Sequence, residues 1–258
     1  MSIPVVLLAG GLGTRLREET EAKPKPMVEV GGYPILWHIM KTYAHYGYDE
    51  FVVCLGYKGH VIKEFFLDYK ARQGGMSIDL ASGVVEMHGN EAGENWTVHL
   101  LETGQDTMTG GRIKRAANFL GRRRFMATYG DGVANIDVNA LVKFHEKHGQ
   151  KATLSAVRPP ARFGGLTIKG DKIATFNEKP LLGEGWINGG YMVFEPEVAD
   201  YIENDVTVLE RAPLERLANE GELMAYRHDK FWQCMDTVRD LTFLREQWDS
   251  GSANWKVW

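Results

Sequence analysis

The chain has 258 residues, 44% of them hydrophobic, which is enough to bury a substantial core in one domain. Its 30 basic and 34 acidic residues leave a net charge of −4, so charge gives no case for a nucleic-acid partner or an anionic membrane. Cys54 and Cys234 lack metal-binding spacing and cannot build a disulfide framework. The first apolar run is too short for a signal peptide or a membrane-spanning helix. We therefore expect a cytoplasmic protein.

The first third of the chain alternates strand and helix patterns. Short aliphatic and aromatic runs predict buried strands over residues 3–9 and 51–55. Apolar residues at helical spacing predict helices over residues 34–47 and 61–69. This order favours a parallel sheet with right-handed crossovers.

The remaining two thirds continue this pattern with smaller β elements. Residues 82–95, rich in Gly, Glu and Asn, are predicted to form a mobile surface loop. Further strands are predicted over residues 97–102, 124–129, 151–157 and 189–194, helices over 110–120, 137–149 and 237–251, and a hairpin from 166–168 with 174–176. The tail 255–258 holds two tryptophans, and we expect them to be exposed unless they pack on a neighbouring subunit.

The loop after the first predicted strand is the most informative segment. Gly10, Gly11 and Gly13 are followed directly by Thr14 and Arg15. Glycines allow the backbone to approach a ligand more closely than any Cβ permits. Exposed N–H groups in such a loop can surround phosphate oxygens, and the arginine supplies a forked cation for them. The pattern predicts a triphosphate-binding loop.

Several phosphate-binding loops can be compared with this segment. A Walker A loop needs a lysine before its Ser or Thr, and residues 10–16 lack it. A dinucleotide fingerprint needs a third small residue where Leu16 stands, which argues against a nicotinamide-dependent oxidoreductase. A plain strand-to-helix turn stays open as the structural alternative. The signature GGxGTRL, in contrast, matches at every position, and by it the segment resembles the sugar-nucleotide pyrophosphorylases, a nucleotidyltransferase family.

The resemblance extends along essentially the whole chain. Lys25 aligns with the family's catalytic lysine, with Lys23 as a competitor for that role. Further matching segments are residues 34–40, 56–59, 107–112, 129–132 and 232–237. Together they are similar to the glucose-1-phosphate cytidylyltransferase branch, which makes CDP-glucose and pyrophosphate from CTP and α-D-glucose 1-phosphate.

The resemblance implies a fold class and a division of labour. The fold would be a Rossmann-like three-layer α/β/α nucleotidyltransferase domain with a mostly parallel central sheet and small β excursions in the second half. A single domain would span residues 1–258. Within it, residues 1–135 would mainly bind the nucleotide, and residues 136–258 would mainly bind the sugar phosphate and support oligomerisation. The cytidylyl branch implies a homo-oligomer, specifically a hexamer.

Two aspartates are candidate ligands for Mg²⁺, which prefers carboxylate, phosphate and water oxygens. Asp131 lies between two glycines just past a predicted strand, where α/β sheets place ligands. Asp236 directly precedes a predicted helix. Taken alone, these aspartates could be a turn residue and a helix cap. The resemblance matches both to the family's metal aspartates.

The other site residues are also implied by the resemblance. Arg15 and Lys25 would act in catalysis by stabilising the departing pyrophosphate. The nucleotide would be bound by Leu8, Ala9, Gly10, Gly11, Leu12, Gly13, Thr14, Arg15, Lys25, Thr107, Arg112 and Gly130. The sugar phosphate would be bound by Glu178, Lys179, Asn188 and Gly189. Taken alone, Arg112 could instead be a solvent-facing arginine at the start of a helix.

Two functional alternatives remain open at this stage. The same chemistry could use UTP, dTTP or another sugar 1-phosphate, because only residues 107–112 and the overall match indicate cytosine. The fold could also serve as a catalytically silent nucleotide-sensing subunit. The presence of Arg15, Lys25, Asp131 and Asp236 together argues against that second alternative.

Overall fold

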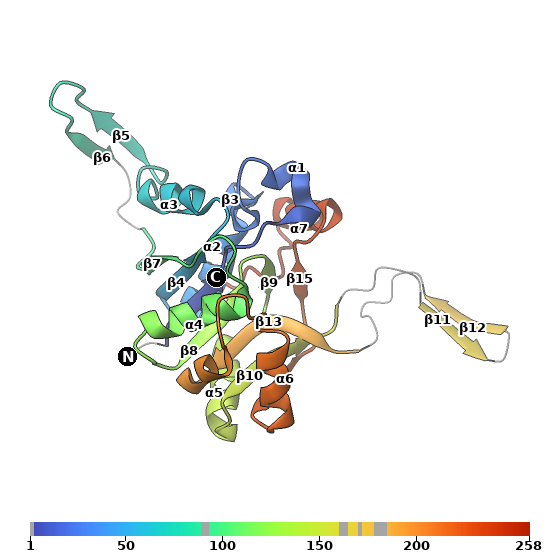
Figure 1. The fold of residues 1–258 in the computed structure, drawn as a ribbon. Coiled ribbons are helices and arrows are strands. Elements are labelled where there is room, and N and C mark those ends of the chain that lie inside the picture. The colour runs from blue at the N-terminus through green and yellow to red at the C-terminus, as the bar shows by residue number, and fades with distance from the viewer. Residues whose placement is uncertain (1–2, 89–92, 160–164, 170–171, 178–184) are drawn as a thin grey trace.

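A mostly parallel sheet forms the centre of the computed structural model, which describes residues 3–88, 93–159, 165–169, 172–177 and 185–258 (Figure 1). In spatial order its seven strands are β14 (Leu223–His228), β10 (Ala152–Val157), β13 (Ile187–Phe194), β8 (Phe125–Tyr129), β1 (Val5–Leu8), β4 (Glu50–Leu55) and β7 (Thr97–Glu102). β13 is antiparallel to both neighbours, and the other pairs are parallel. The predicted fold class is confirmed.

Helices cover both faces of this sheet. The helices are α1 (Arg17–Thr20), α2 (Ile35–His45), α3 (Gly59–Leu67), α4 (Thr109–Phe119), α5 (Val138–His148), α6 (Ala212–Asn219) and α7 (Val238–Asp249). Val5 and Leu7 of β1 belong to a core shared with α2, α3, α5 and α7, whereas Val6 and Leu8 belong to a core shared with α4 and α6. Successive strand residues point to opposite faces, so β1 is buried from both sides in a three-layer arrangement.

Four small antiparallel pairs are added to this body. They are β2 (Glu29–Val30) with β3 (Tyr33–Pro34), β5 (Gly75–Ile78) with β6 (Val85–His88), β9 (Gly132–Ala134) with β15 (Trp232–Cys234), and β11 (Gly165–Lys169) with β12 (Lys172–Asn177). Pairs β5–β6 and β11–β12 extend away from the body (Figure 1). The β11–β12 pair confirms the hairpin predicted from the sequence.

Two predictions were wrong. Residues 85–88, expected within a loop, form β6, whose residues are all exposed like those of β5. A strand exposed along its whole length has no reason to alternate polar and apolar residues, so its sequence gives no clear signal. The aromatic tail is not exposed either: Trp255 is fully buried and stacks on Phe231 and Trp248. The tail therefore packs on its own chain, and it gives no reason to expect a contact between subunits.

Candidate active site

The loop after β1, the start of α4 and the end of β8 line a cavity of about 550 Å³. The predicted nucleotide-binding residues that line it are Leu8, Gly10, Gly11, Leu12, Gly13, Thr14, Arg15, Lys25, Thr107, Arg112 and Gly130. Ala9 is buried and is not part of the wall. Other lining residues were given no role by the sequence analysis. Thr109 and Tyr129 lie inside segments that it singled out, 107–112 and 129–132, and Gln105 lies two residues before the first of them.

Each of the three loop positions, 10, 11 and 13, is glycine for a different structural reason. Gly13 has a φ of +63°, a left-handed conformation that favours glycine. A Cβ on Gly10 would lie 2.2 Å from Cζ of Arg112, so that position must be glycine for the arginine to fit. A Cβ on Gly11 would meet nothing within 4 Å. Only Gly11 is therefore unconstrained by the chain itself and left for a ligand to approach.

Arg112 is a buried clamp rather than a surface arginine, since only 4% of it is exposed. Its Nη1 donates to the carbonyl of Leu55 at 2.8 Å and to Oγ1 of Thr103 at 2.6 Å. Its Nη2 donates to the carbonyls of Gly10 at 3.2 Å and Gln105 at 3.3 Å. Burial lowers the pKa of this guanidinium from its usual value. The clamp ties the loop after β1 to the end of β4 and the segment before α4.

A short ladder brings the two candidate metal aspartates together. Asp131 directly precedes β9, and Asp236 follows β15 with only Met235 between them. The two strands pair with Gly132 opposite Cys234, and the amide of Met235 donates to the carbonyl of Asp131 at 2.8 Å. This pairing accounts for the approach of two residues that are far apart in the sequence.

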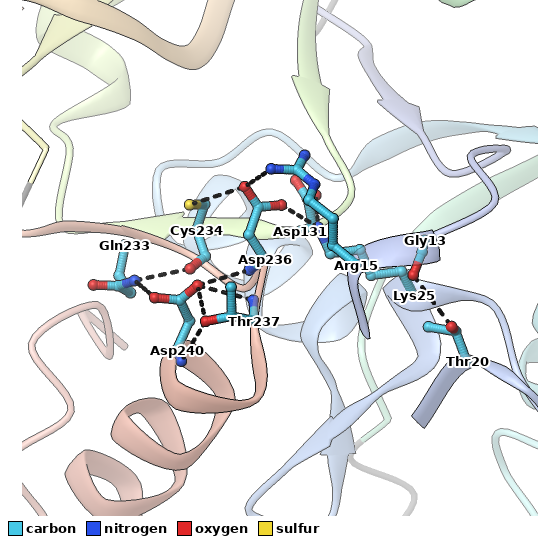
Figure 2. A network of polar contacts seen from close by, with 10 residues as sticks. All are labelled: Gly13, Arg15, Thr20, Lys25, Asp131, Gln233, Cys234, Asp236, Thr237 and Asp240. Atoms are coloured by element: carbon cyan, nitrogen blue, oxygen red, sulfur yellow. Dashed lines mark hydrogen bonds and ion pairs between the residues drawn. The ribbon is translucent and has the colours of Figure 1, made fainter. Parts of the chain in front are cut away.

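Asp236 is not the cap of the helix that follows it. Thr237 caps α7, because its hydroxyl accepts from the amide of Asp240 while the Asp240 carboxylate accepts from the amide of Thr237. Figure 2 shows this capping pair beside Asp236. Thr237 thus leaves the Asp236 carboxylate free to face the loop after β1.

Lys25 joins the two carboxylates. Its Nζ donates to Oδ2 of Asp131 and to Oδ1 of Asp236, both at 2.6 Å, and Nη1 of Arg15 donates to Oδ2 of Asp236 at 2.7 Å (Figure 2). Burial alone would lower the pKa of Lys25, but the carboxylates, Asp131 foremost, outweigh it and raise that pKa. Burial likewise opposes ionisation of Asp236, yet the neighbouring Lys25 keeps its pKa lowered. Lys23 pairs instead with Glu29 at 3.2 Å, outside this cluster.

The donor set around this cluster suits a hard divalent cation. Asp131 and Asp236 offer only oxygen as ligand atoms. Asp131 lines the cavity, and Asp236 contacts Arg15 and Lys25, which line it too. Within the described part of the chain, no three His, Cys, Asp or Glu side chains are grouped to hold a metal ion. Mg²⁺ needs no such group, because it typically uses one or two carboxylates and completes its octahedron with phosphate oxygens and water. The two aspartates therefore fit Mg²⁺ bound together with a nucleotide.

The predicted sugar-phosphate residues are only partly described. Glu178 and Lys179 lie outside the described residues. Asn188 and Gly189 lie in β13; Nδ2 of Asn188 donates to the hydroxyl of Tyr129 at 3.2 Å, and the carbonyl of Gly189 accepts from the indole of Trp232 at 2.7 Å. Tyr129 lines the cavity, so Asn188 stands directly behind its wall.

Comparison with known proteins identifies the family that this fold and site define. Residues 4–242 match the family model described as nucleotidyl transferase, and the chain belongs to that family. The chain is 51% identical over 254 residues to a glucose-1-phosphate cytidylyltransferase of Salmonella typhimurium, with 98% of both chains covered. It is 45% identical to a probable glucose-1-phosphate cytidylyltransferase of Bacillus subtilis, covering 98% of this chain and 99% of the relative.

Solved structures agree on the fold. The crystal structure of HddC from Yersinia pseudotuberculosis matches with a TM-score of 0.69 at 24% identity, covering 95% of this chain and 99% of HddC. A putative glucose-1-phosphate thymidylyltransferase from Bacillus anthracis matches with a TM-score of 0.66 at 18% identity, covering 98% of this chain and 96% of that one. Among the described residues no helix is long and apolar enough to cross a membrane.

Proposed function

We propose that the protein transfers a cytidylyl group from CTP to α-D-glucose 1-phosphate, which yields CDP-glucose and pyrophosphate. The observation that carries the proposal is the convergence of Lys25, Arg15, Asp131 and Asp236 beside the glycine loop. The relatives at 51% and 45% identity, whose names state this activity or its probable form, support the choice of substrates.

In the proposed reaction, an oxygen of the sugar phosphate forms a bond to the α-phosphorus of CTP while the bond to pyrophosphate breaks. Both reactants are anions, so bringing them together and neutralising their charge is the main catalytic work. Backbone N–H groups of residues 10–14 would hold the triphosphate, and Lys25 and Arg15 would stabilise the leaving pyrophosphate. The attacking phosphate is already ionised near neutral pH, so the chain needs no general base.

The two aspartates would hold Mg²⁺, which when bound supplies charge neutralisation at the phosphates. Lys25 occupies the space between the two carboxylates. It therefore has to exchange carboxylate partners for phosphate partners when the nucleotide enters. Residues 1–135 would supply most of these contacts within the single domain.

Arg112 and Thr107 lie in the cavity wall, where both would contact the cytidine nucleotide. The two Nη atoms of Arg112 already make four hydrogen bonds to protein oxygens. Arg112 would therefore act on the choice of base by holding the glycine loop and the segment around Gln105 and Thr107 in place. The preference for CTP over UTP and dTTP rests on this segment and on the names of the relatives.

The second half would bind the sugar phosphate through Asn188, Gly189, Glu178 and Lys179. The amide of Asn188 both donates and accepts, which suits a sugar diol. Assembly into a homo-oligomer, with the hexamer as the specific expectation, belongs to the same proposal. Sedimentation at several protein concentrations measures it.

Pyrophosphate release tests the proposed function directly. The protein is assayed with CTP, UTP, dTTP, ATP and GTP, each combined with glucose 1-phosphate, mannose 1-phosphate and galactose 1-phosphate. We expect turnover to be highest with CTP and glucose 1-phosphate and to stop in excess chelator, with recovery on adding Mg²⁺. Turnover with no pair would instead favour a nucleotide-sensing subunit, and undiminished turnover in chelator would contradict the role of Asp131 and Asp236.

A further inference from the structure

Glu210 connects two walls of the cavity without belonging to any motif in the sequence. It lies in the segment between the 3-10 turn 196–201 and α6. Its Oε1 accepts from the hydroxyl of Tyr129 at 2.5 Å, and its Oε2 accepts from Oγ1 of Thr109 at 2.6 Å. Tyr129 and Thr109 both line the cavity. One carboxylate thus holds a hydroxyl on each side of the site.

The contact with Tyr129 continues to the sugar side. Nδ2 of Asn188 donates to the Tyr129 hydroxyl at 3.2 Å, and Oδ1 of Asn188 accepts from the amide of Gly190 at 2.9 Å. Gly190 has a φ of +81°, and a Cβ there would lie 2.6 Å from Cδ2 of Tyr129. The tyrosine ring therefore rests on the backbone of Gly190 while its hydroxyl is shared between Glu210 and Asn188.

We propose that Glu210 is a positioning residue for sugar-phosphate binding. The Glu210 carboxylate accepts the hydrogen of the Tyr129 hydroxyl. The phenol oxygen is then left as an acceptor for Nδ2 of Asn188. The amide of Asn188 is then presented in one orientation, with its oxygen on Gly190 and its NH₂ on Tyr129. This inference rests on the proposed function, because Asn188 is assigned there to the sugar phosphate.

The two contacts of Glu210 are not equally replaceable. The start of α4 is also held by backbone bonds, from the amide of Met108 to the carbonyl of Asp205 at 2.8 Å and from Gly110 to Thr207 at 3.0 Å. Loss of the Glu210 carboxylate leaves these bonds in place. The Tyr129 hydroxyl, in contrast, has Glu210 and Asn188 as its side-chain partners within the described residues. Removing Glu210 should therefore loosen the sugar side more than the nucleotide side.

A split between the two KM values tests this asymmetry. In Glu210→Ala we expect KM for glucose 1-phosphate to rise about tenfold, which corresponds to the loss of one charged hydrogen bond. KM for CTP should change less than about twofold. Tyr129→Phe should give the same split, and the double variant should add nothing to either change. Glu210→Gln retains an oxygen acceptor for Tyr129 and should recover most of the loss. An equal rise of both KM values, or additive effects, would overturn the proposal.

The chain offers a matched control elsewhere on its surface. Glu220 accepts from the hydroxyl of Tyr201, the same pair of groups at the end of α6. Glu220→Ala removes a tyrosine–glutamate bond without touching the cavity. We expect it to leave both KM values unchanged, which separates positioning from a general loss of stability.

Hydrogen exchange provides a readout that needs no turnover. The Gly190 amide is held by the Asn188 side chain, so its exchange rate reports whether Asn188 keeps its orientation. In Glu210→Ala and Tyr129→Phe, peptides covering residues 187–191 should exchange at least several-fold faster than in Glu220→Ala. Unchanged exchange would refute the positioning role even if the wild type turned over. If the wild type turns over no substrate pair but the two variants still exchange faster, the positioning of Asn188 is upheld and only the proposed function is refuted.

Discussion

Two cations face the same cavity and are held in opposite ways. Lys25 lies between two carboxylates, Asp131 and Asp236, at 2.6 Å from each. The Arg112 guanidinium is as deeply buried, yet it donates to three carbonyls and the hydroxyl of Thr103. Among the residues that the structure describes, no carboxylate forms an ion pair with it. The first charge is compensated within the protein and the second is not.

This difference separates an exchangeable contact from a fixed one. An ammonium ion is a compact charge on a flexible stem, so Lys25 can leave its carboxylates for a phosphate. A planar guanidinium with four fixed bonds cannot move without breaking the loop that it clamps. A buried charge without a partner is costly, and an anionic ligand in the cavity supplies the missing compensation for Arg112. Lys25 can thus move from its carboxylates to the substrate, whereas Arg112 stays in place and its charge is compensated when the substrate binds.

Replacing Lys25 should have the largest effect. In Lys25→Met we expect kcat/KM to fall about 10³-fold, because the charge that stabilises the leaving pyrophosphate is lost. The same variant should bind Mn²⁺ about tenfold more tightly without nucleotide, since the ammonium no longer competes for the two carboxylates. Pyrophosphate release measures the first change, and electron paramagnetic resonance of free Mn²⁺ measures the second.

Lys23→Met is the matched control for this prediction. Lys23 lies two residues away and pairs with Glu29 outside the cluster, so its loss should change neither quantity. Weaker Mn²⁺ binding in Lys25→Met would show that Lys25 holds the carboxylates in place rather than competing for them.

Replacing Arg112 tests the uncompensated cation. In Arg112→Lys the charge stays but the fork is lost, and we expect kcat/KM with CTP to fall about 10²-fold. The preference for CTP over UTP should shrink at the same time, because one ammonium cannot hold the carbonyls of Leu55, Gly10 and Gln105 together, which loosens the wall that would select the base. Arg115→Lys is the control: it lies in the same helix, is half exposed and pairs with Asp205. An unchanged CTP-to-UTP ratio in Arg112→Lys would contradict the role of Arg112 in base selection.

The sequence predicted the elements that have a strong apolar pattern. The strand at residues 97–102 and the helix at 34–47 agree with β7 and α2, because one or both faces of each pack on a core. It did not predict β9 and β15, three residues each, whose pairing brings Asp131 to Asp236. Strands that short carry no periodicity, and their register depends on contacts between distant parts of the chain.

The site was predictable where a motif supplied the residue type. Lys25 could be found by its alignment, but its two ion pairs could not, because they depend on how β9 and β15 pair. Arg112 was expected at the nucleotide, whereas its role as a clamp depends on carbonyls from β4 and the glycine loop. Glu210 was missed altogether, since a single glutamate between two elements has no pattern to recognise.

The glycine loop allows the clamp to be disturbed from the other side. In Gly10→Ala the new Cβ would lie 2.2 Å from Cζ of Arg112, and we expect the free energy of unfolding to fall by about 2 kcal/mol. Gly11→Ala should leave the unfolding midpoint unchanged, because its Cβ would meet nothing within 4 Å. Urea denaturation without ligand measures both variants. Equal losses in the two would show that backbone conformation, rather than contact with Arg112, dictates the glycine at position 10.

A third ionisable group, His38, sharpens the comparison, because unlike Arg112 it can lose its proton. His38 is fully buried among Trp248 and Trp255, with a ring nitrogen on the carbonyl of Val30 at 2.9 Å. Burial lowers its pKa to about 4. The unfolded chain, with an ordinary histidine pKa of about 6.5, binds more protons between these values, so stability must fall as pH drops through this window.

From the two pKa values of His38, we expect the free energy of unfolding to fall by about 2 kcal/mol between pH 7 and pH 5. His38→Gln can still donate to Val30 but cannot titrate, so this part of the pH dependence should vanish, as measured by urea unfolding at both pH values. His60→Gln, at an exposed position, should leave the wild-type dependence unchanged. A His38→Gln variant as acid-sensitive as the wild type would mean that other buried histidines, such as His145, cause the loss. His38 stays buried as a neutral ring because it loses its proton. Arg112 stays charged, so the negative charge of a bound ligand has to compensate it.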